Sequence, residues 1–423
     1  MYLKKLKKSI VFTNRLDIFL LIVIFLLAAI PVLLGVLFKE KKEIPEVVQT
    51  VNLYLSRQSG ELLGMETTEK LIREFEEKTP GISILFADNS QQNDEQVHSP
   101  DILVFDDGNY GSLAAYDMLV EFNAFSNHES GSNQLAVPLV SFINLLFYNI
   151  DILSAAGFDS PPKTRDEFTA YARIVAGSNP GVSATALSLK QSDHYSLSRD
   201  VFSWIWAGGG NFWAEGDKPF LNTRLIANDI AFLDTLNREG MMAGGIFETT
   251  GDQRLNEFAG GRIAMMIAST KVIPYLRERM RDGAFGITAV PDANTGGRYS
   301  AGISSIYAGI SADCKNISEA RSFLNFLESK SSFICDELKA VPGIVANIIP
   351  GDYVMDDPYY SKAWEIFEFT QIAEDFKGKP NADEYEAAFL EELRIYFDSR
   401  TRTAQQTITA IQQRWDEIFE GSR

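Results

Sequence analysis

One segment of the sequence constrains the architecture more than any other. Residues 18–38 form an apolar run of 21 residues without a charged side chain. At about 1.5 Å of rise per residue, such a run makes a helix about 30 Å long, which matches the hydrocarbon core of a bilayer. Pro31 lies within the run, but proline is tolerated in membrane-spanning helices. The run therefore predicts a transmembrane helix over residues 18–38.

A cleaved signal peptide is the alternative interpretation of this segment. The apolar region of a signal peptide usually has about 7–15 residues and ends at a cleavage site of small residues. The run in this chain is longer, and no good site of that kind follows it. No Cys lies near its end to accept a lipid. The sequence therefore favours an anchor that is retained.

The charges that flank the apolar run predict its orientation. Five basic side chains precede the run, whereas the three Lys that follow it are nearly balanced by two Glu. Positively charged flanks stay in the cytoplasm. We therefore expect a basic cytoplasmic tail over residues 1–17, a linker over residues 39–46, and the rest of the chain outside the membrane. A single span serves as an anchor and not as a transport path.

The part of the chain beyond the anchor is strongly acidic. The whole sequence has a formal charge of −18, but residues 1–43 carry eight basic and three acidic side chains, which leaves −23 for the remainder. Nucleic-acid-binding proteins need basic surfaces, so we exclude nucleic acid as a partner. The chain has only three His and two Cys, too few for a zinc ribbon or a haem-attachment array, and we expect neither a metal nor a cofactor.

Strands and helices alternate along the outer part of the chain. Apolar and β-rich runs predict strands at residues 47–55, 82–87 and 101–105, with an amphipathic helix between the first two. This alternation is typical of βαβ units and of an α/β fold. The apolar run at residues 136–149 is too long for one strand, and we expect Pro138 to break it. Further strands are expected at residues 262–268, 284–290 and 303–311, and helices at residues 164–176, 195–207, 224–238 and from 316 onward.

Catalytic signatures are missing from the sequence. No GxSxG, HExxH or P-loop motif occurs, and no pair of carboxylates is singled out as that of a glycosidase. His98, His128 and His194 lie in polar, loop-like contexts and are interpreted as surface residues. Cys314 and Cys335 either form a disulfide or are buried free thiols, and the sequence leaves both alternatives open.

Polar residues follow two of the predicted strands. Asp106, Asp107, Asn109 and Tyr110 come directly after the strand at residues 101–105, and Arg57 and Gln58 follow the first strand. Ligands of open α/β sheets bind beyond the carboxyl ends of the strands. The alternative is that these residues merely begin the next helices. Three of the five Trp lie in residues 202–213, where they are either core residues or a surface on which a sugar ring stacks.

Five segments of the outer part occur in the order found in one family of proteins. They are EFEEKTPGISI (74–84), DILVFDDGNYGSLAAYDMLVEF (101–122), AVPLVSFINLLFYNIDILSAAGFDSPPKTRDEF (136–168), NEFAGGRIAMMIAST (256–270) and FGITAVPDANTGGRYSAGISSIYAGIS (285–311). The third, which ends in a PPKTxDEF pattern, is the most specific. Together they resemble the extracellular solute-binding proteins of family 1, the receptors of ABC-type sugar importers, which include maltodextrin-binding protein.

The resemblance implies a two-lobed α/β fold of the periplasmic-binding-protein (Venus-flytrap) type. In this fold, hinge strands join the lobes and the ligand binds in the cleft between them. The resemblance assigns residues 47–137 and 303–350 to the first lobe, 138–302 to the second lobe, residues near 138–149 and 289–311 to the hinges, and 351–423 to C-terminal helices that pack on the lobes.

The resemblance also implies a set of ligand-binding residues at the cleft. The Trp that the family has after the AMMIAS stretch is either replaced by Lys271 or lost in this chain, which weakens the case for a neutral oligosaccharide. The residues are Arg57, Gln58, Asp106, Asp107, Asn109, Tyr110, Trp204, Trp206, Gly208, Gly209, Asn211, Lys271, Gly302, Ser304, Ser305 and Trp364.

We therefore expect a monomeric, membrane-anchored receptor that catalyses no reaction and delivers a sugar or related polyhydroxylated solute to the permease subunits of an ABC-type importer. Acidic and aromatic cleft residues suit hydroxyl groups and sugar rings, and acidic ones disfavour anionic solutes. Two alternatives remain. One is a ligand-sensing module of the same fold that partners another membrane protein, and the other is an anchored carbohydrate hydrolase.

Overall fold

The computed structural model divides the chain into residues 1–49 and residues 50–423. The residues that it describes all belong to the second unit: 50–87, 99–121, 135–178, 180–193, 196–213, 218–221, 223–292, 300–342, 352–373, 376, 379, 381–399 and 401–421. The predicted cytoplasmic tail, membrane span and linker lie outside these residues, as do the three His. Within the described ranges, no helix combines the length and hydropathy needed to cross a membrane.

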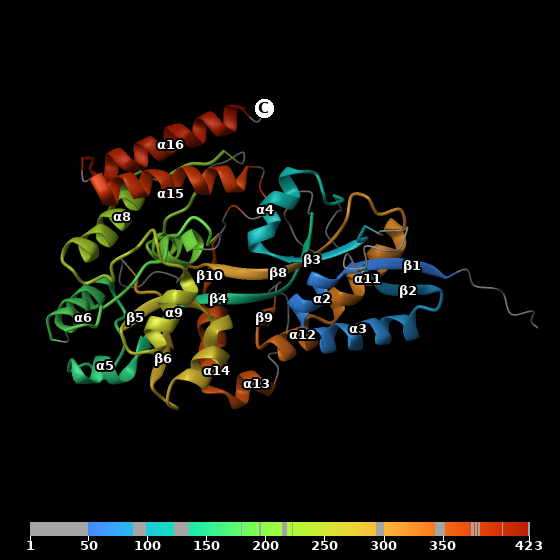
Figure 1. The fold of residues 1–423 in the computed structure, drawn as a ribbon, viewed down its shortest axis with the longest axis horizontal. Coiled ribbons are helices and arrows are strands. Elements are labelled where there is room, and N and C mark those ends of the chain that lie inside the picture. Colours follow the sequence, from blue (N-terminus) through green and yellow to red (C-terminus); the bar gives the residue numbers. More distant parts are fainter. Residues whose placement is uncertain are drawn as a thin grey trace, which may run out of the picture. The chain divides into compact units, whose positions relative to one another are not determined.

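In the described part of the chain, eight strands form one mixed sheet (Figure 1). β1 (Val51–Ser56) pairs in parallel with β2 (Ile82–Ala87) and β3 (Ile102–Asp106). β3 then pairs antiparallel with β8 (Ile303–Ile310), and β8 pairs antiparallel with β4 (Val137–Asn149). This topology confirms the α/β fold class. β8 and β4 lie next to each other near the centre of the sheet.

β4 serves both halves of the sheet. Its first half pairs with β8 and with β9 (Val341–Pro342), and its second half pairs with β5 (Met265–Ser269) and β6 (Phe285–Thr288). The expected break at Pro138 is therefore wrong. β4 is one strand of 13 residues, and it accommodates the proline by a shift of register between Pro138 and Val140. Such an irregularity absorbs the missing backbone donor without ending the strand.

Helices cover the sheet, and two further strands form a short second sheet. A short second sheet pairs β7 (Ser300–Ala301) with β10 (Gln371–Ile372). The helices are α2 (Arg57–Leu63), α3 (Met65–Lys78), α4 (Asp107–Ala115), α5 (Ile150–Ala155), α6 (Arg165–Ser178), the π-helix η1 (Ser198–Phe202), α7 (Ser203–Ala207), α8 (Thr223–Arg238), α9 (Gly251–Ala259), the 3₁₀-helix η2 (Thr270–Val272), α10 (Ile273–Arg279), α11 (Ile317–Ser329), α12 (Ser331–Leu338), α13 (Asp352–Asp356), α14 (Pro358–Glu368), α15 (Ala382–Ser399) and α16 (Ala404–Gly421).

Local sequence explains where several helices begin and end. The helix expected after β1 is two helices, because Gly64 adopts a φ of 83° between α2 and α3. α6 follows Thr164, whose hydroxyl accepts a hydrogen bond from the Glu167 backbone N–H at 3.2 Å. α9 begins with a capping box between Thr250 and Gln253, which satisfies backbone donors at both ends of the first turn.

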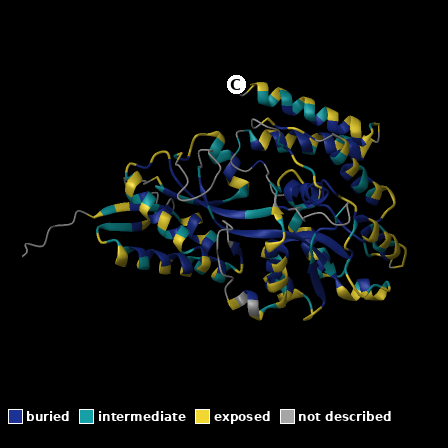
Figure 2. Ribbon diagram, turned by 180° about the vertical axis from the view of Figure 1, so that it is seen from behind, coloured by how far each residue is buried: buried dark blue, intermediate teal, exposed yellow. Residues whose placement is uncertain are grey.

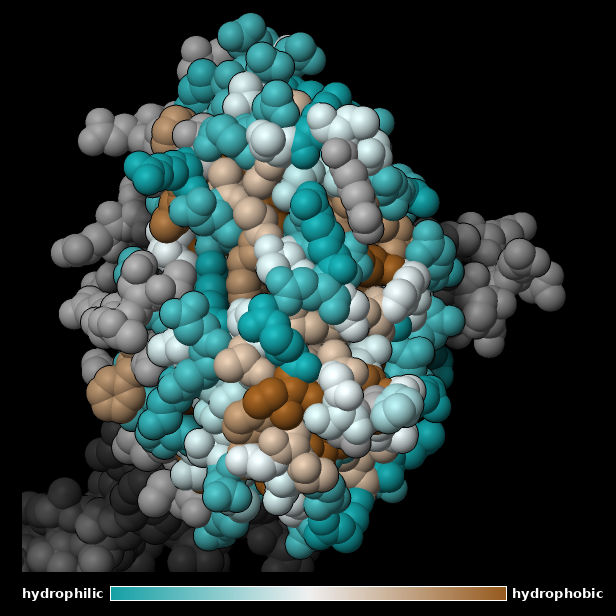
Figure 3. All heavy atoms as spheres, turned by 90° about the vertical axis from the view of Figure 1, so that its left-hand side faces the viewer, coloured by the Kyte–Doolittle hydropathy of each residue, from teal (hydrophilic) through white to brown (hydrophobic). Residues whose placement is uncertain are grey.

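The residues of β4 pack into different hydrophobic cores along the strand, and these cores define the two lobes. Phe142 packs with β1, β3 and α11 in the core of the first lobe, whereas Ile143 and Leu146 pack with residues of the second lobe. In Figure 2 the central strands are mostly buried, β1 and β2 are partly exposed, and the outer faces of the helices are exposed. Figure 3 shows a face of the second lobe on which hydrophilic residues surround a mixed central region that contains patches of hydrophobic residues.

The C-terminal helices α15 and α16 belong to the second-lobe core. Each of these helices turns an apolar face inward, since Tyr385, Phe389, Ile408 and Trp415 are all buried there. Cys314 and Cys335 are both free and buried in the first-lobe core. Burial raises the pKa of the Cys314 thiol to about 11 and that of Cys335 to about 12, so both are neutral, as expected for packing residues.

Candidate ligand-binding cleft

A cavity of about 640 Å³ lies between the lobes. Its walls come from the N-terminus of α4 in the first lobe, from several segments of the second lobe, and from β8 where that strand joins the two. The lining residues are Asp106, Asp107, Gly108, Asn109, Ser112, Ser192, Asp193, Arg199, Thr250, Gly251, Asp252, Lys271, Ser304 and Asp383.

A smaller cavity of about 260 Å³ adjoins the first one. The two share Asp107, Gly108, Asp193 and Asp383. The smaller cavity also has apolar walls, which include Leu197, Phe376 and Leu390. The cleft thus combines a large polar chamber with a small, partly apolar one.

The first-lobe wall is built where β3 ends and α4 begins. Asp106 is the N-cap of α4, and its Oδ1 accepts a hydrogen bond from the Asn109 side chain at 2.9 Å. Asp107 Oδ2 accepts a hydrogen bond from the backbone N–H of Ser305 at 2.9 Å. The Asp107 carboxylate therefore connects the start of α4 to the strand β8 that runs between the lobes.

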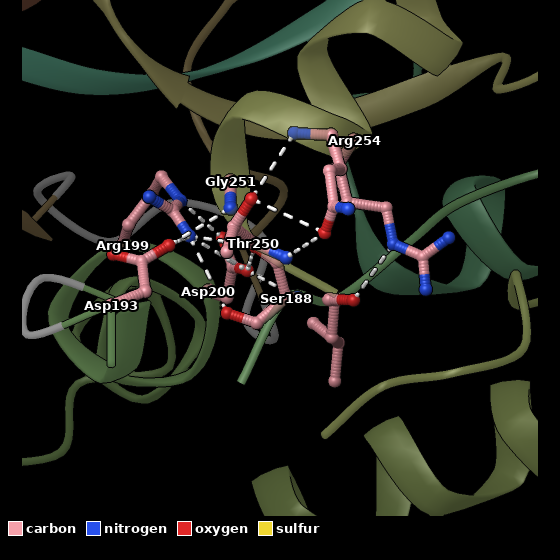
Figure 4. A network of polar contacts seen from close by, with 9 residues as sticks. Ser188, Asp193, Arg199, Asp200, Thr250, Gly251 and Arg254 are labelled. Carbon is pink, nitrogen blue, oxygen red and sulfur yellow. Dashed lines mark hydrogen bonds and ion pairs between the residues drawn. The ribbon is translucent and has the colours of Figure 1, made fainter. Parts of the chain in front are cut away.

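Across the cavity, Arg199 holds two carboxylates in place (Figure 4). Its Nε donates to Asp200 Oδ1 at 2.7 Å, and its Nη2 donates to Asp193 Oδ2 at 3.3 Å and to Ser188 Oγ at 2.6 Å. Burial by itself would lower the pKa of Arg199, but Asp200 and Asp193 raise it further than burial lowers it. The guanidinium is therefore permanently charged, and it fixes the orientation of Asp193 at the cavity wall.

The N-terminus of α9 completes this network. The Gly251 backbone N–H donates to Asp193 Oδ2 at 2.9 Å. A Cβ atom on Gly251 would lie 2.6 Å from Arg199 Nη1, closer than such contacts allow. Only glycine at this position lets the start of α9 approach the guanidinium and Asp193 together.

α15 reaches from the second lobe to the first beside the cavity. Ser112 Oγ on α4 donates to Asp383 Oδ2 on α15 at 3.0 Å. A Cβ atom on Gly111 would lie 2.9 Å from Asp383 Oδ1 and 3.3 Å from Ala382 Cβ. The glycine thus permits close contact between α4 and α15, and Asp383 links the lobes while it lines both cavities.

Five of the residues predicted at the cleft line the larger cavity. They are Asp106, Asp107, Asn109, Lys271 and Ser304. Ser305 lies beside them, where its hydroxyl shares a 2.7 Å hydrogen bond with Ser141 Oγ. The structure therefore brings the residues of the first strand–helix loop, the returning strand and the segment after β5 together.

Other predicted residues lie away from the described cavities. Arg57 and Gln58 are exposed at the start of α2, where Arg57 lies 3.8 Å from Glu61. Tyr110 is buried against Phe105 and Tyr307, and burial raises the pKa of its hydroxyl to about 12. Its environment is that of a core residue.

The predicted residues of the Trp-rich segment also lie away from these cavities. Trp204 and Trp206 are buried in the second-lobe core, and Gly208 and Gly209 end α7. Asn211 is exposed and accepts a hydrogen bond from the Trp213 backbone at 3.2 Å. Of the remaining two, Gly302 packs against the Trp206 ring, and Trp364 on α14 is buried and donates to Glu368 at 2.9 Å.

Nine of the fourteen residues that line the larger cavity are not among those predicted from the sequence. Asp193, Arg199, Gly251, Asp252 and Asp383 all come from the second lobe. The Thr-x-x-Gln pattern at residues 250–253 does signal a helix start, as Thr164 and Glu167 do elsewhere, but it does not reveal what that start faces. Among the described residues, no group of His, Cys, Asp and Glu has a metal-binding arrangement.

Comparison with known sequences gives a family and distant relatives. Residues 59–332 match the family described as bacterial extracellular solute-binding protein. A Deinococcus radiodurans protein named Probable ABC transporter-binding protein is 24% identical over 271 residues, which cover 60% of this chain and 62% of that protein. A binding protein of Brucella abortus is 22% identical over 197 residues, 46% of each chain. The chain thus spans about half the length of the latter relative.

Solved structures share the fold over most of the chain. The GacH receptor of Streptomyces glaucescens has a TM-score of 0.64 at 14% identity, and UgpB from Mycobacterium tuberculosis has 0.67 at 19%. Each match covers 88% of this chain and 99% of the other. Maltose-bound MalE3 of T. maritima has a TM-score of 0.66 at 16% identity, with 87% and 100% covered. These likenesses confirm the two-lobed fold, and the family match shows that the chain belongs to the bacterial extracellular solute-binding proteins, which bind solutes and are not enzymes.

Proposed function

We propose that this protein is a membrane-anchored receptor that binds a sugar or related polyhydroxylated solute outside the membrane and delivers it to an ABC-type importer. The observation that carries the proposal is the cavity between the lobes, whose walls offer carboxylates, hydroxyls, amides and backbone N–H groups from both sides. A solute with many hydroxyl groups satisfies such walls by hydrogen bonding in two directions, as donor and as acceptor.

The known relatives support the class of solute. The GacH structure is described in complex with acarbose, MalE3 with maltose and UgpB with glycerophosphocholine. Acarbose and maltose carry many hydroxyl groups, and glycerophosphocholine carries two. The name of the Deinococcus protein mentions an ABC transporter, which supports the proposed importer partner.

The sequence supports the proposed tether. Residues 18–38 have the length and apolar character of a single span, and the basic residues before them favour a cytoplasmic N-terminus. The solute-binding unit begins at Thr50. The proposed receptor would therefore be tethered to the membrane in which its importer lies.

Calorimetric titration of the full chain with monosaccharides and oligosaccharides tests the proposal, and nuclear magnetic resonance of the recovered solute checks that it is unchanged. Asp107→Ala should weaken binding by about 1.5–3 kcal/mol, as expected for hydrogen bonds to a charged group. Asp398→Ala is the matched control, because Asp398 is exposed on α15 and absent from the cavity lining. Conversion of the solute, or equal affinities for the two variants, would contradict the proposal.

A further inference from the structure

We propose that the solute carries a positive charge as well as hydroxyl groups, as an amine-bearing sugar or polyol does. This inference rests on the proposed function, since it concerns the same cavity and adds one chemical property to the same class of solute. Three observations support it: the composition of the cavity wall, the ion pairs that its arginine already makes, and the helix N-termini that lie at the wall.

The wall of the larger cavity is polar throughout its described residues. Each of the residues that line it is either glycine or has a polar or charged side chain. Ligand pockets are normally lined mainly by apolar and aromatic groups, and sugar rings stack their apolar face on aromatic side chains. The only aromatic residue among the described walls of either cavity is Phe376, in the smaller one. Recognition in the larger cavity must therefore come from hydrogen bonds and charge.

Carboxylates outnumber cations in this wall. Asp106, Asp107, Asp193, Asp252 and Asp383 line the cavity, against Arg199 and Lys271. Arg199 is shared between Asp193 and a further carboxylate, Asp200, which lies behind the wall. The guanidinium therefore has no charge to spare for a ligand anion.

The helix termini reduce this negative charge but do not cancel it. The first turns of α4, α9 and α15 all contribute lining residues, and each helix N-terminus acts as about half a positive charge. Together they offset about one and a half charges. Among the described lining residues the five carboxylates exceed the two cations by three, so this part of the wall remains negative by more than one charge. One ammonium group on the solute compensates this excess.

Lys271 contributes a positive charge to the cavity wall, opposite in sign to the carboxylates. It is exposed at the cavity, and its Nζ lies 5.8 Å from the centre of the Phe142 ring. Within the described residues it belongs to none of the ion pairs closer than 4.0 Å. A cationic solute should therefore be repelled by Lys271 and attracted by the carboxylates. Neutralising Lys271 should strengthen its binding, and neutralising a carboxylate should weaken it.

Matched pairs of solutes test the inference on the full chain by calorimetry. The pairs are D-glucosamine with D-glucose, D-galactosamine with D-galactose, and glucamine with sorbitol, at a slightly acidic pH that keeps the amines charged. N-acetyl-D-glucosamine controls for the shape of the substituent without its charge. The charged member should bind at least about ten-fold more tightly, because two charges a few ångströms apart at a protein surface interact by more than 1.4 kcal/mol. The preference should shrink as salt is added.

Two variants should move this preference in opposite directions. Asp252→Asn should weaken binding of the charged member by about ten-fold, and Lys271→Gln should strengthen it by a similar factor. Each should change the affinity for the neutral member by a much smaller factor, and Asp398→Asn should change neither affinity. General damage to the fold lowers both affinities together, so it cannot imitate this pattern.

The outcomes separate the inference from the function on which it rests. Equal or tighter binding of the neutral members, with no opposite response of the two variants, overturns the inference and leaves a receptor for neutral polyols. Tighter binding of spermidine than of any amino sugar overturns the hydroxylated part of the solute class. Failure of every pair to bind, charged and neutral alike, contradicts the proposed function and the inference with it.

Discussion

At the scale of single residues, the geometry of the cleft depends most on Arg199. Its side chain is 11% exposed and touches two carboxylates. Arg199→Ala would leave Asp193 and Asp200 facing each other without a cation, so we expect the free energy of unfolding to fall by about 3–5 kcal/mol. Urea denaturation measures this loss.

The control for this prediction is an arginine in an exposed pair. Arg173 contacts Glu239 at 2.7 Å, but its side chain is 60% exposed, so Arg173→Ala should cost less than about 1 kcal/mol. Similar losses for the two variants would show that the buried network does not stabilise the second lobe.

Asp229 predicts a distinct dependence of stability on pH. Burial, opposed by the ion pair with Arg165, raises the pKa of its carboxyl from 3.8 to about 6. Between these values the folded chain binds a proton that the unfolded chain has lost, so stability falls as the pH rises through this window. A shift of about two units corresponds to about 3 kcal/mol.

Asp229→Asn removes this titration. Urea unfolding at pH 4 and pH 7 should show that the wild type loses about 3 kcal/mol more than the variant over that interval. The exposed Asp151 supplies the control, because Asp151→Asn should keep the wild-type slope. An Asp229→Asn variant with an unchanged slope would contradict the assignment.

Residue by residue, the sequence identified one wall of the cleft better than the other. Asp106 and Asp107 were predictable because they directly follow a buried strand, where the fold class itself places ligands. Asp193 and Asp383 were not, because their positions depend on partners far along the chain: Gly251 for the first and Ser112 for the second. No local pattern encodes such contacts.

At the scale of elements, the contact between α7 and the start of β8 joins the Trp-rich segment to the strands between the lobes. A Cβ atom on Gly302 would lie 2.5 Å from Trp206 Cζ3 and 3.0 Å from Asn144 Nδ2. Gly302→Ala should therefore destabilise the protein by about 1–3 kcal/mol through overpacking. Thermal or urea unfolding measures the change.

Gly177 in α6 offers the same substitution without the crowding. Nothing lies within 4 Å of a Cβ atom built there, so Gly177→Ala should leave stability unchanged or raise it by up to about 1 kcal/mol. Equal effects at the two positions would mean that the approach of Gly302 to Trp206 is not close in solution.

The local pattern of apolar residues predicted some strands of this protein correctly and missed the full length of another. The pattern of apolar residues located the strands β2, β3 and β8, because short apolar and β-rich runs are a local property of the sequence. It did not predict that β4 continues past Pro138, since a single strand that passes through two cores has no polar face to mark its middle. It also left open whether Trp204 and Trp206 face a ligand or the core, because both environments are apolar.

At the scale of the whole molecule, the proposed tether predicts where the protein is found after cell fractionation. The full chain should remain in the membrane pellet after washing with carbonate, because 21 apolar residues insert with high affinity. A variant that lacks residues 1–38 but is exported by another signal should appear in the soluble fraction. Release of the full chain by carbonate, or retention of the shortened one, would contradict the anchor.

The proposed function requires solute to bind in the cavity between the lobes, against the N-termini of α4, α9 and α15. Hydrogen exchange measured by mass spectrometry, with and without a solute that calorimetry shows to bind, tests it most directly. The amides at the start of α4, in residues 191–193 and at the start of α9 should exchange more slowly in the complex, while those of α12 should not change. Retained binding heat with protection confined to other segments would contradict the claim.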